Sequence, residues 1–392
     1  MRKILLILFL AFLSVNSVFA EELAFVYING SNNNDIKMKA WYEKGINKIH
    51  PVLKKKFMNN SYIKKNYRGG KLVVQDKPVI FFWGYKSKND LDFVKDRLEL
   101  SKPISSIGAR TVRSLFTQYI HDAVWVQKTH NMLPILDELN EVVKKETNDG
   151  DNIIMYGYSA GSFVTYQYLL NKLRYFKTVD IATGLHADED TIELINSFNL
   201  NDTCLSALRA SRAAILTDTG KLIINPSDDI LKVSLSDLND ITEKVCAPVD
   251  KIRGIVNYAS PLVLFYSDMS DSDYEFHYYN KLLVKYVMEN GIFMLTVNFR
   301  EDPLGFPTSN NLTAEEISKV LELEINNPTG VIYDNSGIYS RRMFPFAHTS
   351  YWSSKNAFSN GVVNSFVNGY KFQYDKKYQK RVLKRHSKKS EL

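Results

Sequence analysis

The stretch that decides the fold reads Asn152-Ile153-Ile154-Met155-Tyr156-Gly157-Tyr158-Ser159-Ala160-Gly161-Ser162-Phe163. It begins with an apolar run of strand length and continues into a turn of the pattern Gly-x-Ser-x-Gly, and a helical pattern follows over residues 163–173. A serine between a strand and a helix in this order is typical of a nucleophile elbow. The stretch therefore predicts a buried strand whose carboxyl end presents the hydroxyl of Ser159.

The geometry of the turn explains which residues flank Ser159. A sharp strand-to-helix turn brings backbone segments close together, and Gly157 and Gly161 have no Cβ to obstruct that approach. The amide of Ala160, at the start of the helix, faces the place where an oxyanion develops when a serine attacks a carbonyl carbon. We therefore predict that the two glycines serve the turn and that Ser159 is the nucleophile.

Strands and helices alternate along the rest of the chain. Apolar runs of strand length lie at residues 23–28, 72–74, 79–83, 252–258, 292–297 and 331–333, and helical patterns lie at 35–57, 90–105, 114–145, 274–289 and 313–324. Pro51 is expected to interrupt the first helix, and the third pattern is either one long helix or two helices broken near Pro134. Thr313 and Glu316 form a capping box. The alternation predicts an α/β fold with a mostly parallel central sheet covered by helices on both faces.

One long segment departs from this alternation. Residues 184–250 are rich in Asn, Asp, Ser and Leu, and they include both cysteines, Cys204 and Cys246. We interpret the segment as a cap or lid over the carboxyl edge of the sheet, with a long surface excursion as the alternative. The two cysteines are compatible with one disulfide in an oxidising compartment or with two buried thiols.

The amino terminus has the pattern of a secretory signal. Residues 1–20 contain the basic pair Arg2 and Lys3, a short apolar core and a small-residue cleavage site after Ala20. No other stretch reaches the length of a membrane span. The sequence therefore predicts an exported protein, secreted or periplasmic, with a main domain at residues 21–374.

Positive charge concentrates at the carboxyl terminus. Residues 375–392 hold eight basic and two acidic side chains, so they contribute +6 to a formal net charge of +7. Without Arg2 and Lys3, the domain at residues 21–374 has a net charge of −1. We interpret the basic pI as a property of this tail, either a solvated helix end or a weak contact with an anionic membrane surface, and expect no nucleic-acid partner.

A serine nucleophile needs a base, and the expected chain order is Ser, then Asp or Glu, then His. Only His348 and His386 follow every plausible acid, and His386 lies among lysines that disfavour an imidazolium. His348 follows the last predicted strand, where a base belongs. We interpret His121 beside Asp122 as a helical pair without a catalytic role.

Three carboxylates are candidates for the acid that orients His348. Asp302 follows the strand predicted at residues 292–297 by a short loop, and Pro303 restricts that loop. Glu301 is its neighbour, and Asp334 follows the last predicted strand. We favour Asp302 and keep the other two as alternatives.

A second oxyanion donor is expected from the loop after an early strand. Asn29, Gly30 and Ser31 follow the strand at residues 23–28, and glycine there lets the backbone approach a substrate. We therefore predict an oxyanion hole built from the amides of Gly30 or Ser31 together with Ala160, with an ordinary turn at Asn29 as the alternative.

These motifs together resemble a known superfamily. They are Asn29-Gly30-Ser31, Gly157-Tyr158-Ser159-Ala160-Gly161, Asp302-Pro303 and His348-Thr349-Ser350-Tyr351-Trp352. The set resembles the α/β-hydrolase superfamily, and the Asp-Pro pair and the His followed by Tyr-Trp look most like the fungal-type, class 3 lipases. The resemblance implies an α/β-hydrolase fold and a triad of Ser159, Asp302 and His348. The chain departs from the family at Asn29, where the pattern has His-Gly or Gly-x-Ser, and in the segment 184–250.

The sequence thus predicts an exported serine hydrolase that cleaves carboxylic esters through an acyl-enzyme. The expected substrate is a small-molecule or lipid ester, and no motif calls for a cofactor or a metal ion. The alternatives are a non-catalytic binding or assembly protein on the same fold, and a peptidase or thioesterase. The acyl chain, the head group and the oligomeric state are left open by the sequence.

Overall fold

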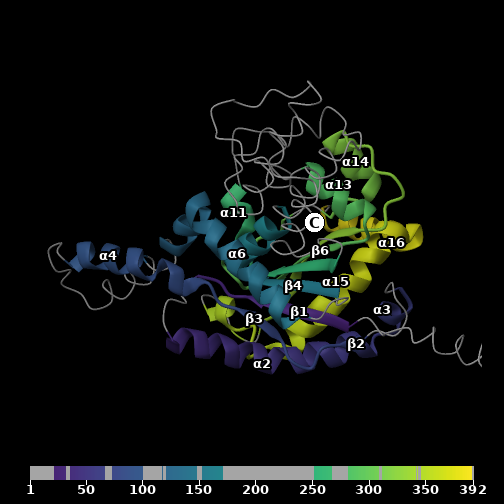
Figure 1. Cartoon of the computed structure of the whole chain (residues 1–392). Coiled ribbons are helices and arrows are strands. Elements are labelled where there is room, and N and C mark those ends of the chain that lie inside the picture. The colour runs from purple at the N-terminus through teal and green to yellow at the C-terminus, as the bar shows by residue number, and fades with distance from the viewer. Residues whose placement is uncertain are drawn as a thin grey trace, which may run out of the picture.

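The computed structural model in Figure 1 describes residues 22–31, 36–66, 73–99, 117, 121–147, 152–170, 251–266, 281–308, 311–340, 342 and 346–390. The predicted leader, both cysteines and the segment 184–250 lie outside these residues, so the predictions about them stay predictions. Among the described helices, none has an apolar stretch long enough to cross a bilayer.

A single parallel sheet organises the described chain. Its seven strands are β1 (Glu22–Ile28), β2 (Val73–Val74), β3 (Val79–Phe81), β4 (Asn152–Tyr158), β5 (Ile252–Tyr258), β6 (Phe293–Phe299) and β7 (Val331–Ile338). The order is β2-β1-β4-β5-β6-β7, and β3 continues the edge begun by β2 along β1. The described pairings are all parallel, which confirms the predicted α/β class with a mostly parallel sheet.

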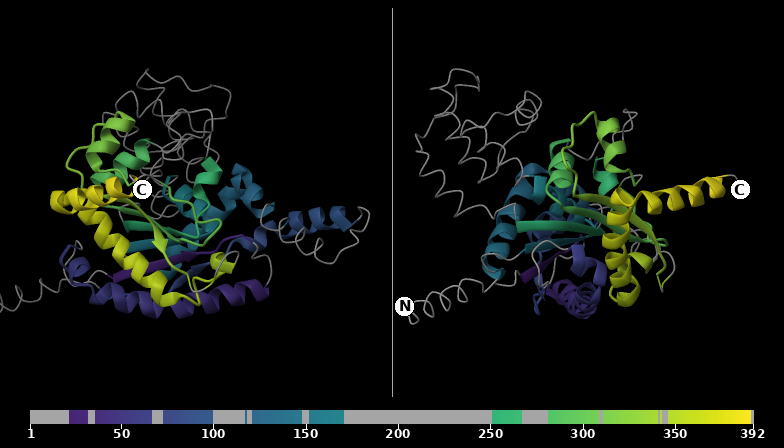
Figure 2. Two further views of the ribbon diagram at one scale, coloured as in Figure 1. Left: turned by 180° about the vertical axis from the view of Figure 1, so that it is seen from behind. Right: turned by 90° about the vertical axis from the view of Figure 1, so that its right-hand side faces the viewer.

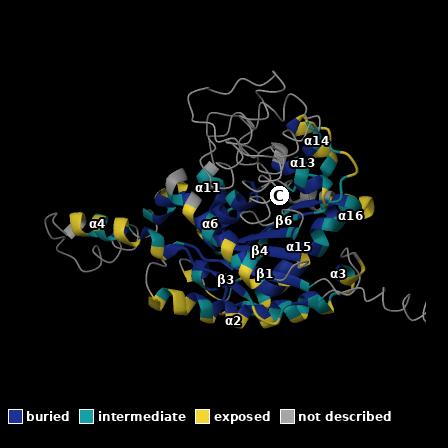
Figure 3. Cartoon of the chain, in the orientation of Figure 1, coloured by how far each residue is buried: buried dark blue, intermediate teal, exposed yellow. Residues whose placement is uncertain are grey.

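Side chains of each strand alternate between two hydrophobic cores. On β1, Phe25 and Tyr27 point into one core, whereas Val26 and Ile28 point into the other. Successive strand residues face opposite sides of a sheet, so a strand buried on both sides reads as a continuous apolar run. Figure 3 shows the consequence, since β1, β4, β5 and β6 are buried along nearly their whole length and many exposed residues lie on the outer surfaces of the helices.

Helices cover both faces of the sheet (Figures 1 and 2). The first core lies under α2 (Ile36–Asn59), α3 (Ser61–Asn66) and α15 (Lys355–Tyr374). The second lies under α6 (Thr129–Glu146), the helix at residues 161–170, α11 (Leu262–Tyr266), α13 (Lys281–Glu289) and α14 (Ala314–Leu321). The remaining elements are η1 (Gly84–Ser87), α4 (Lys88–Glu99), η3 (Phe346–Thr349) and α16 (Lys376–Ser390).

The prediction that Pro51 interrupts its helix is wrong, and so is the alternative that placed a break near Pro134. Pro51 lies inside α2, which runs unbroken because buried residues on both sides of it, such as Ile46 and Leu53, hold the helix against the sheet. Pro134 likewise lies inside α6, and the break in this region falls at the extended Lys128 instead. Packing of an apolar helix face can outweigh the lost backbone hydrogen bond and the steric cost of one proline.

The predicted capping box of α14 is confirmed. The Thr313 hydroxyl accepts from the Glu316 amide at 3.3 Å, and the Glu316 carboxylate accepts from the Thr313 amide at 2.7 Å. The helix ends at Leu321 rather than Glu324, because Glu322 adopts a left-handed conformation with φ of 52°.

The sequence analysis did not predict α15. Its signal is a row of small residues four apart, Gly361, Ser365 and Gly369, which lie on one side of a helix. A Cβ at either glycine would overlap side chains of β7. The small residues therefore let α15 approach β7 closely, a constraint that hydrophobic periodicity does not reveal.

A buried histidine links α2 to the edge of the sheet. His50 Nε2 lies 3.0 Å from the Gln75 carbonyl oxygen, and Nδ1 lies 3.1 Å from the Tyr27 hydroxyl. A carbonyl can only accept, so Nε2 carries the proton and Nδ1 accepts from Tyr27. Burial, and to a smaller extent Lys54, lowers the pKa of His50.

This lowered pKa predicts a pH-dependent stability. As the pH is lowered through about 6.5, the unfolded chain binds a proton at His50 before the folded chain does. The free energy of unfolding therefore decreases as the pH decreases. We expect His50→Gln to reduce that fall, by up to about 1.4 kcal/mol per pH unit. Urea unfolding of both proteins at about pH 7.5 and 5.5 measures the difference. Equal losses in the two proteins would contradict the assignment.

Candidate active site

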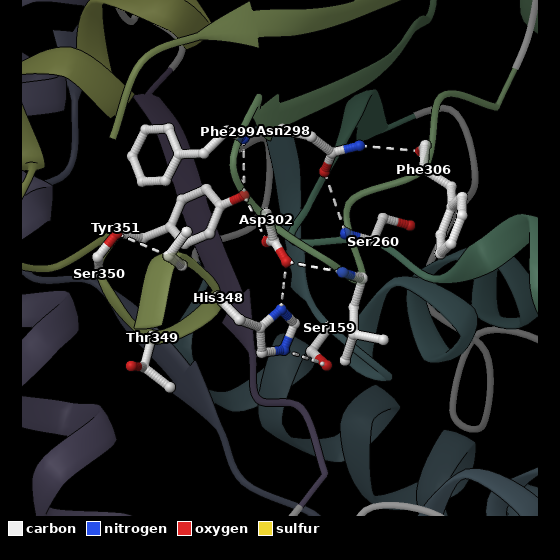
Figure 4. Close-up of polar contacts among 12 residues, drawn as sticks. Ser159, Ser260, Asn298, Phe299, Asp302, Phe306, His348, Thr349, Ser350 and Tyr351 are labelled. Atoms are coloured by element: carbon white, nitrogen blue, oxygen red, sulfur yellow. Dashed lines mark hydrogen bonds and ion pairs between the residues drawn. The ribbon is translucent and has the colours of Figure 1, made fainter. Parts of the chain in front are cut away.

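The three predicted site residues follow the carboxyl ends of three parallel strands. Ser159 follows β4 directly, Asp302 lies three residues beyond β6, and His348 lies in η3 after β7. The carboxyl ends of parallel strands share one edge of a sheet, so side chains far apart in the sequence meet there. Figure 4 shows the three side chains in contact.

His348 forms hydrogen bonds with both of the other residues. Its Nδ1 lies 2.9 Å from Asp302 Oδ1, and its Nε2 lies 3.1 Å from Ser159 Oγ (Figure 4). An ionised carboxylate only accepts, so Nδ1 carries the proton and Nε2 accepts from the serine hydroxyl. All three residues are buried, with at most 6% of each exposed.

The turn at Ser159 is strained in the manner of an elbow. Ser159 has a φ of 51°, a left-handed conformation that non-glycine residues rarely adopt. Its amide donates to the Tyr258 carbonyl at 3.0 Å, and its carbonyl accepts from the Ser162 hydroxyl at 2.6 Å. These bonds hold the conformation and direct the hydroxyl of Ser159 toward His348.

Both elbow glycines lie where a side chain would overlap the backbone. A Cβ at Gly157 would lie 2.7 Å from the Gly161 carbonyl oxygen. A Cβ at Gly161 would lie 2.5 Å from the Asn29 carbonyl oxygen. The close approach expected from the Gly-x-Ser-x-Gly pattern is therefore present, and it includes the loop after β1.

That loop lies against Ser159. The register pairs Ile28 with Gly157, and a Cβ at Gly30 would lie only 2.7 Å from Ser159 Cβ. Asn29 holds the loop, because its side chain donates to the Gly30 carbonyl at 2.7 Å and accepts from the Trp83 amide at 2.8 Å. Gly30, Ser31 and Ala160 thus lie on the two segments beside the serine, and their role as oxyanion donors stays a prediction.

The Asp302 carboxylate is held by two further groups. Its Oδ1 accepts from the Leu304 amide and its Oδ2 from the Tyr351 hydroxyl, both at 2.9 Å. The Tyr351 oxygen in turn accepts from the Phe299 amide at 3.0 Å. Burial, followed by the nearby Asp302 carboxylate, raises the pKa of Tyr351 well above its usual range, so the hydroxyl keeps its proton and donates.

The other two candidate acids are engaged elsewhere. Asp334 Oδ1 accepts from the amide and the hydroxyl of Thr308, at 3.1 and 2.8 Å. Glu301 accepts from the Ser340 amide at 2.9 Å. Of the three carboxylates, Asp302 is the one that the structure brings to His348.

A buried network joins the serine turn to the loop that carries Asp302. The Ser260 hydroxyl donates to Ser162 Oγ at 2.9 Å, and the Ser260 amide donates to Asn298 Oδ1 at 3.1 Å. The Asn298 amide group then donates to the Phe306 carbonyl at 2.9 Å (Figure 4). Sequence reasoning missed Ser260 and Asn298, and their only signal is a polar side chain at the end of an otherwise apolar strand.

Tyr158 and Tyr351 are two further site residues whose roles the sequence analysis did not assign. The Tyr158 hydroxyl donates to the His348 carbonyl at 2.9 Å, and its ring lies 5.5 Å from the imidazole with an interplanar angle of 29°. This residue stands at the x position of Gly-x-Ser-x-Gly. It fixes the backbone of His348, whereas Tyr351 fixes the carboxylate behind it.

The pair of His121 and Asp122 lies in a different part of the molecule. Asp122 accepts from the Ser87 hydroxyl at 2.8 Å and lies 3.3 Å from His121 Nδ1. Asp122 is fully buried and links its helix to η1. Within the described ranges, no group of three His, Cys, Asp or Glu side chains has the arrangement of a metal site.

Comparisons of the chain with protein-family models, curated proteins and solved structures give no match. The geometry of the site is therefore the basis for a functional assignment.

The Tyr351 contact gives a testable prediction. We expect Tyr351→Phe to lower turnover by about 10- to 100-fold, since a hydrogen bond to a charged group contributes about 1.5–3 kcal/mol. The matched control is Tyr156→Phe, because the buried Tyr156 hydroxyl has no hydrogen-bond partner among the described residues. Steady-state kinetics and thermal unfolding of both variants test the prediction. A similar loss of turnover in both would show that any buried tyrosine change disturbs the site.

Proposed function

We propose that this protein is a serine hydrolase that cleaves carboxylic esters through an acyl-enzyme. The observation that carries the proposal is the position of His348, hydrogen-bonded to Ser159 on one side and to Asp302 on the other. A nucleophile, a base and an orienting acid in this contact form the arrangement used for acyl transfer.

The proposed reaction has two halves. In the first, Ser159 Oγ attacks the ester carbonyl carbon while its proton passes to His348 Nε2, and the alcohol leaves with that proton. In the second, His348 takes a proton from water, the water oxygen attacks the acyl carbon, and Ser159 Oγ departs with the proton. The products are a carboxylic acid and an alcohol, and the enzyme returns to its starting state.

Asp302 supports both halves without transferring a proton. Its carboxylate keeps the proton of His348 on Nδ1, so Nε2 is free to accept, and it stabilises the imidazolium that forms. The donors from Leu304 and Tyr351 favour the ionised carboxylate.

The oxyanion hole is proposed from the amide of Ala160 and an amide of Gly30 or Ser31. Support comes from the position of Ala160 directly after the nucleophile and from the close approach of Gly30 to Ser159. One such donor contributes about 3–4 kcal/mol to lowering the barrier.

We also propose that the fold is that of an α/β-hydrolase, with lipases as the most similar members. The support is the chain order of Ser159, Asp302 and His348 after the carboxyl ends of β4, β6 and β7, with the loop after β1 beside the serine turn. The prediction that residues 184–250 form a cap or lid belongs to this proposal.

A fluorophosphonate probe tests the proposal directly. Such probes react with an activated serine hydroxyl, so we expect rapid labelling, and peptide mass spectrometry should locate the adduct at Ser159. Heat-denatured protein is the control and should not react. Folded protein that fails to react would favour the alternative of a binding or assembly protein.

The class of acyl substrate needs a second experiment. We expect hydrolysis of nitrophenyl esters in a series from acetate to long acyl chains, with greater efficiency for the esters than for matched anilides or peptides. A preference for acetate would argue against a lipase. Faster cleavage of thioesters or of peptides would instead indicate a thioesterase or a peptidase.

A further inference from the structure

Charge is distributed very unevenly over the helices of this protein. The helices α2, α3 and α15 on one face of the sheet, together with α16, which follows α15, contain nineteen basic residues and one acidic residue, Glu43. Their net charge is +18, whereas the whole chain has a formal net charge of +7. The outward surface of these four helices is called the basic face below.

The basic face is broader than the carboxyl-terminal tail. Seven of its lysines lie on α2, two on α3 and two on α15, and the other eight basic residues lie on α16. The domain therefore has a strongly positive side although its net charge is near zero. The net charge does not reveal this side, because acidic residues elsewhere in the domain balance it. The tail still accounts for the net positive charge of the sequence, but positive side chains also gather on one side of the domain.

Helices on the opposite face differ. There, α6, α11, α13, α14 and the helix at residues 161–170 contain five basic and seven acidic side chains, a net charge of −2. Among the described helices, the sheet thus separates a positive set from a nearly neutral one. Charge separated in this way orients a protein toward a negatively charged surface.

Basic side chains of this face are open to solvent. Exposed examples lie on each of three helices, including Lys44 and Lys48 on α2, Lys64 on α3 and Lys380 on α16. Within the described residues, the carboxylate partners of the α2 lysines are Glu43 for Lys39 and Asp76 for Lys54. Figure 2 shows α2 and α15 on the same side of the molecule, with α16 extending away from the body.

Composition and exposed apolar residues indicate the kind of partner. Seventeen of the nineteen basic residues are lysines, which act as point charges and lack the planar fork of arginine for bidentate recognition. The start of α2 also exposes Ile36 at 86% and Trp41 at 37%. Lysines around an exposed aromatic and an aliphatic side chain suit the interface of a bilayer, where anionic head groups cover an apolar layer.

We propose that the basic face binds the surface of membranes that contain anionic phospholipids. Contact is electrostatic over α2, α3, α15 and α16, with Ile36 and Trp41 entering the interface at one end. The lysine-rich composition and these two side chains favour a bilayer over a nucleic acid, for which arginine contacts and aromatic stacking would be expected.

Vesicle sedimentation of the purified protein tests the proposal. We expect binding to vesicles of phosphatidylcholine with about one-third phosphatidylglycerol, at least tenfold tighter than to phosphatidylcholine alone, and a loss of binding as salt increases. Equal binding to the two kinds of vesicle, or no binding to either at low salt, would overturn the proposal.

Charge-reversal variants locate the surface. The triple variant Lys44→Glu, Lys48→Glu, Lys380→Glu should weaken binding to the anionic vesicles by about a hundredfold or more. The matched control is Lys128→Glu, Lys145→Glu, Lys319→Glu, which makes the same charge change at exposed sites beside the opposite face. Circular dichroism and thermal unfolding verify that both variants fold. A comparable loss in the control would show that net charge alone matters and would refute a specific face.

A third variant separates a bilayer from other polyanions. Ile36→Ser replaces an exposed apolar side chain with a small polar one. The change should weaken vesicle binding by several-fold and leave any binding to double-stranded DNA unchanged. Tighter binding of the wild type to DNA than to vesicles of equal charge concentration would make a nucleic acid the partner and overturn the membrane proposal. The experiments do not depend on the chemistry of Ser159, so vesicle binding and hydrolysis can fail separately.

Discussion

Replacing Ser159 with alanine is expected to lower ester turnover by about five to six orders of magnitude. The reason is geometric, since Ser159 Oγ is the hydroxyl within hydrogen-bond distance of His348 Nε2. Without that oxygen no acyl-enzyme forms, and the remaining groups can do no more than assist the attack of water. Kinetics with a nitrophenyl ester and the loss of fluorophosphonate labelling measure the effect.

A neighbouring serine provides the control for this change. The Ser162 hydroxyl is fully buried and donates to the Ser159 carbonyl, so Ser162→Ala removes a hydroxyl from the same turn without removing the nucleophile. We expect this variant to retain labelling at a lower rate, because one bond that holds the turn is lost, and to keep far more turnover than Ser159→Ala. Labelling that persists in Ser159→Ala would show that the reactive residue is another one.

Replacing Asp302 with asparagine is expected to lower turnover by about four orders of magnitude and to leave the fold intact. The asparagine amide group donates to His348 Nδ1, and the imidazole proton then moves to Nε2, where it can no longer accept from Ser159. The KM should change far less than kcat, because the substitution affects a group behind the reacting atoms. Steady-state kinetics and circular dichroism measure both quantities.

Asp334 provides a matched control for the acid. Asp334→Asn removes a charge at a buried position inside β7, where the carboxylate accepts from Thr308. The sequence analysis placed Asp334 after this strand, but β7 continues to Ile338. We expect a loss of stability of about 1–3 kcal/mol and turnover within a few-fold of the wild type. If this variant and not Asp302→Asn lost turnover, the proposed acid would be wrong.

Much of the site could be predicted because its residues follow recognisable strands. The apolar runs before Ser159 and Asp302 predicted β4 and β6, and the turn residues after them marked the carboxyl edge. His348 was selected by its place in the chain order and by the unsuitable surroundings of His386. Those arguments use only sequence order and the geometry of parallel strands.

Contacts between distant residues could not be predicted in the same way. Tyr351 lies three residues after His348, yet nothing in that spacing shows that its hydroxyl joins Asp302 to the Phe299 amide. The sequence favours Asp302 as the acid but leaves Glu301 and Asp334 open as alternatives. Their separation into one acid beside His348 and two that hold loops depends on the packing of the sheet.

The helices also combine features that the local sequence predicts with features that depend on tertiary packing. The capping box of Thr313 and Glu316 is a local signal, and the structure has it as predicted. The passage of α2 through Pro51 and the approach of α15 to β7 are tertiary effects, since in each case burial against the sheet compensates for unfavourable local sequence.

By itself, the sequence determined the α/β class, the parallel strands and the serine turn, because strand length, glycine placement and chain order are local or one-dimensional properties. Only the tertiary structure decided which acid contacts His348, which tyrosines support it, and that lysines scattered over α2, α3 and α15 lie on one side. Hydrogen bonds and surface charge depend on distances in space, and these are set by how the helices pack on the sheet.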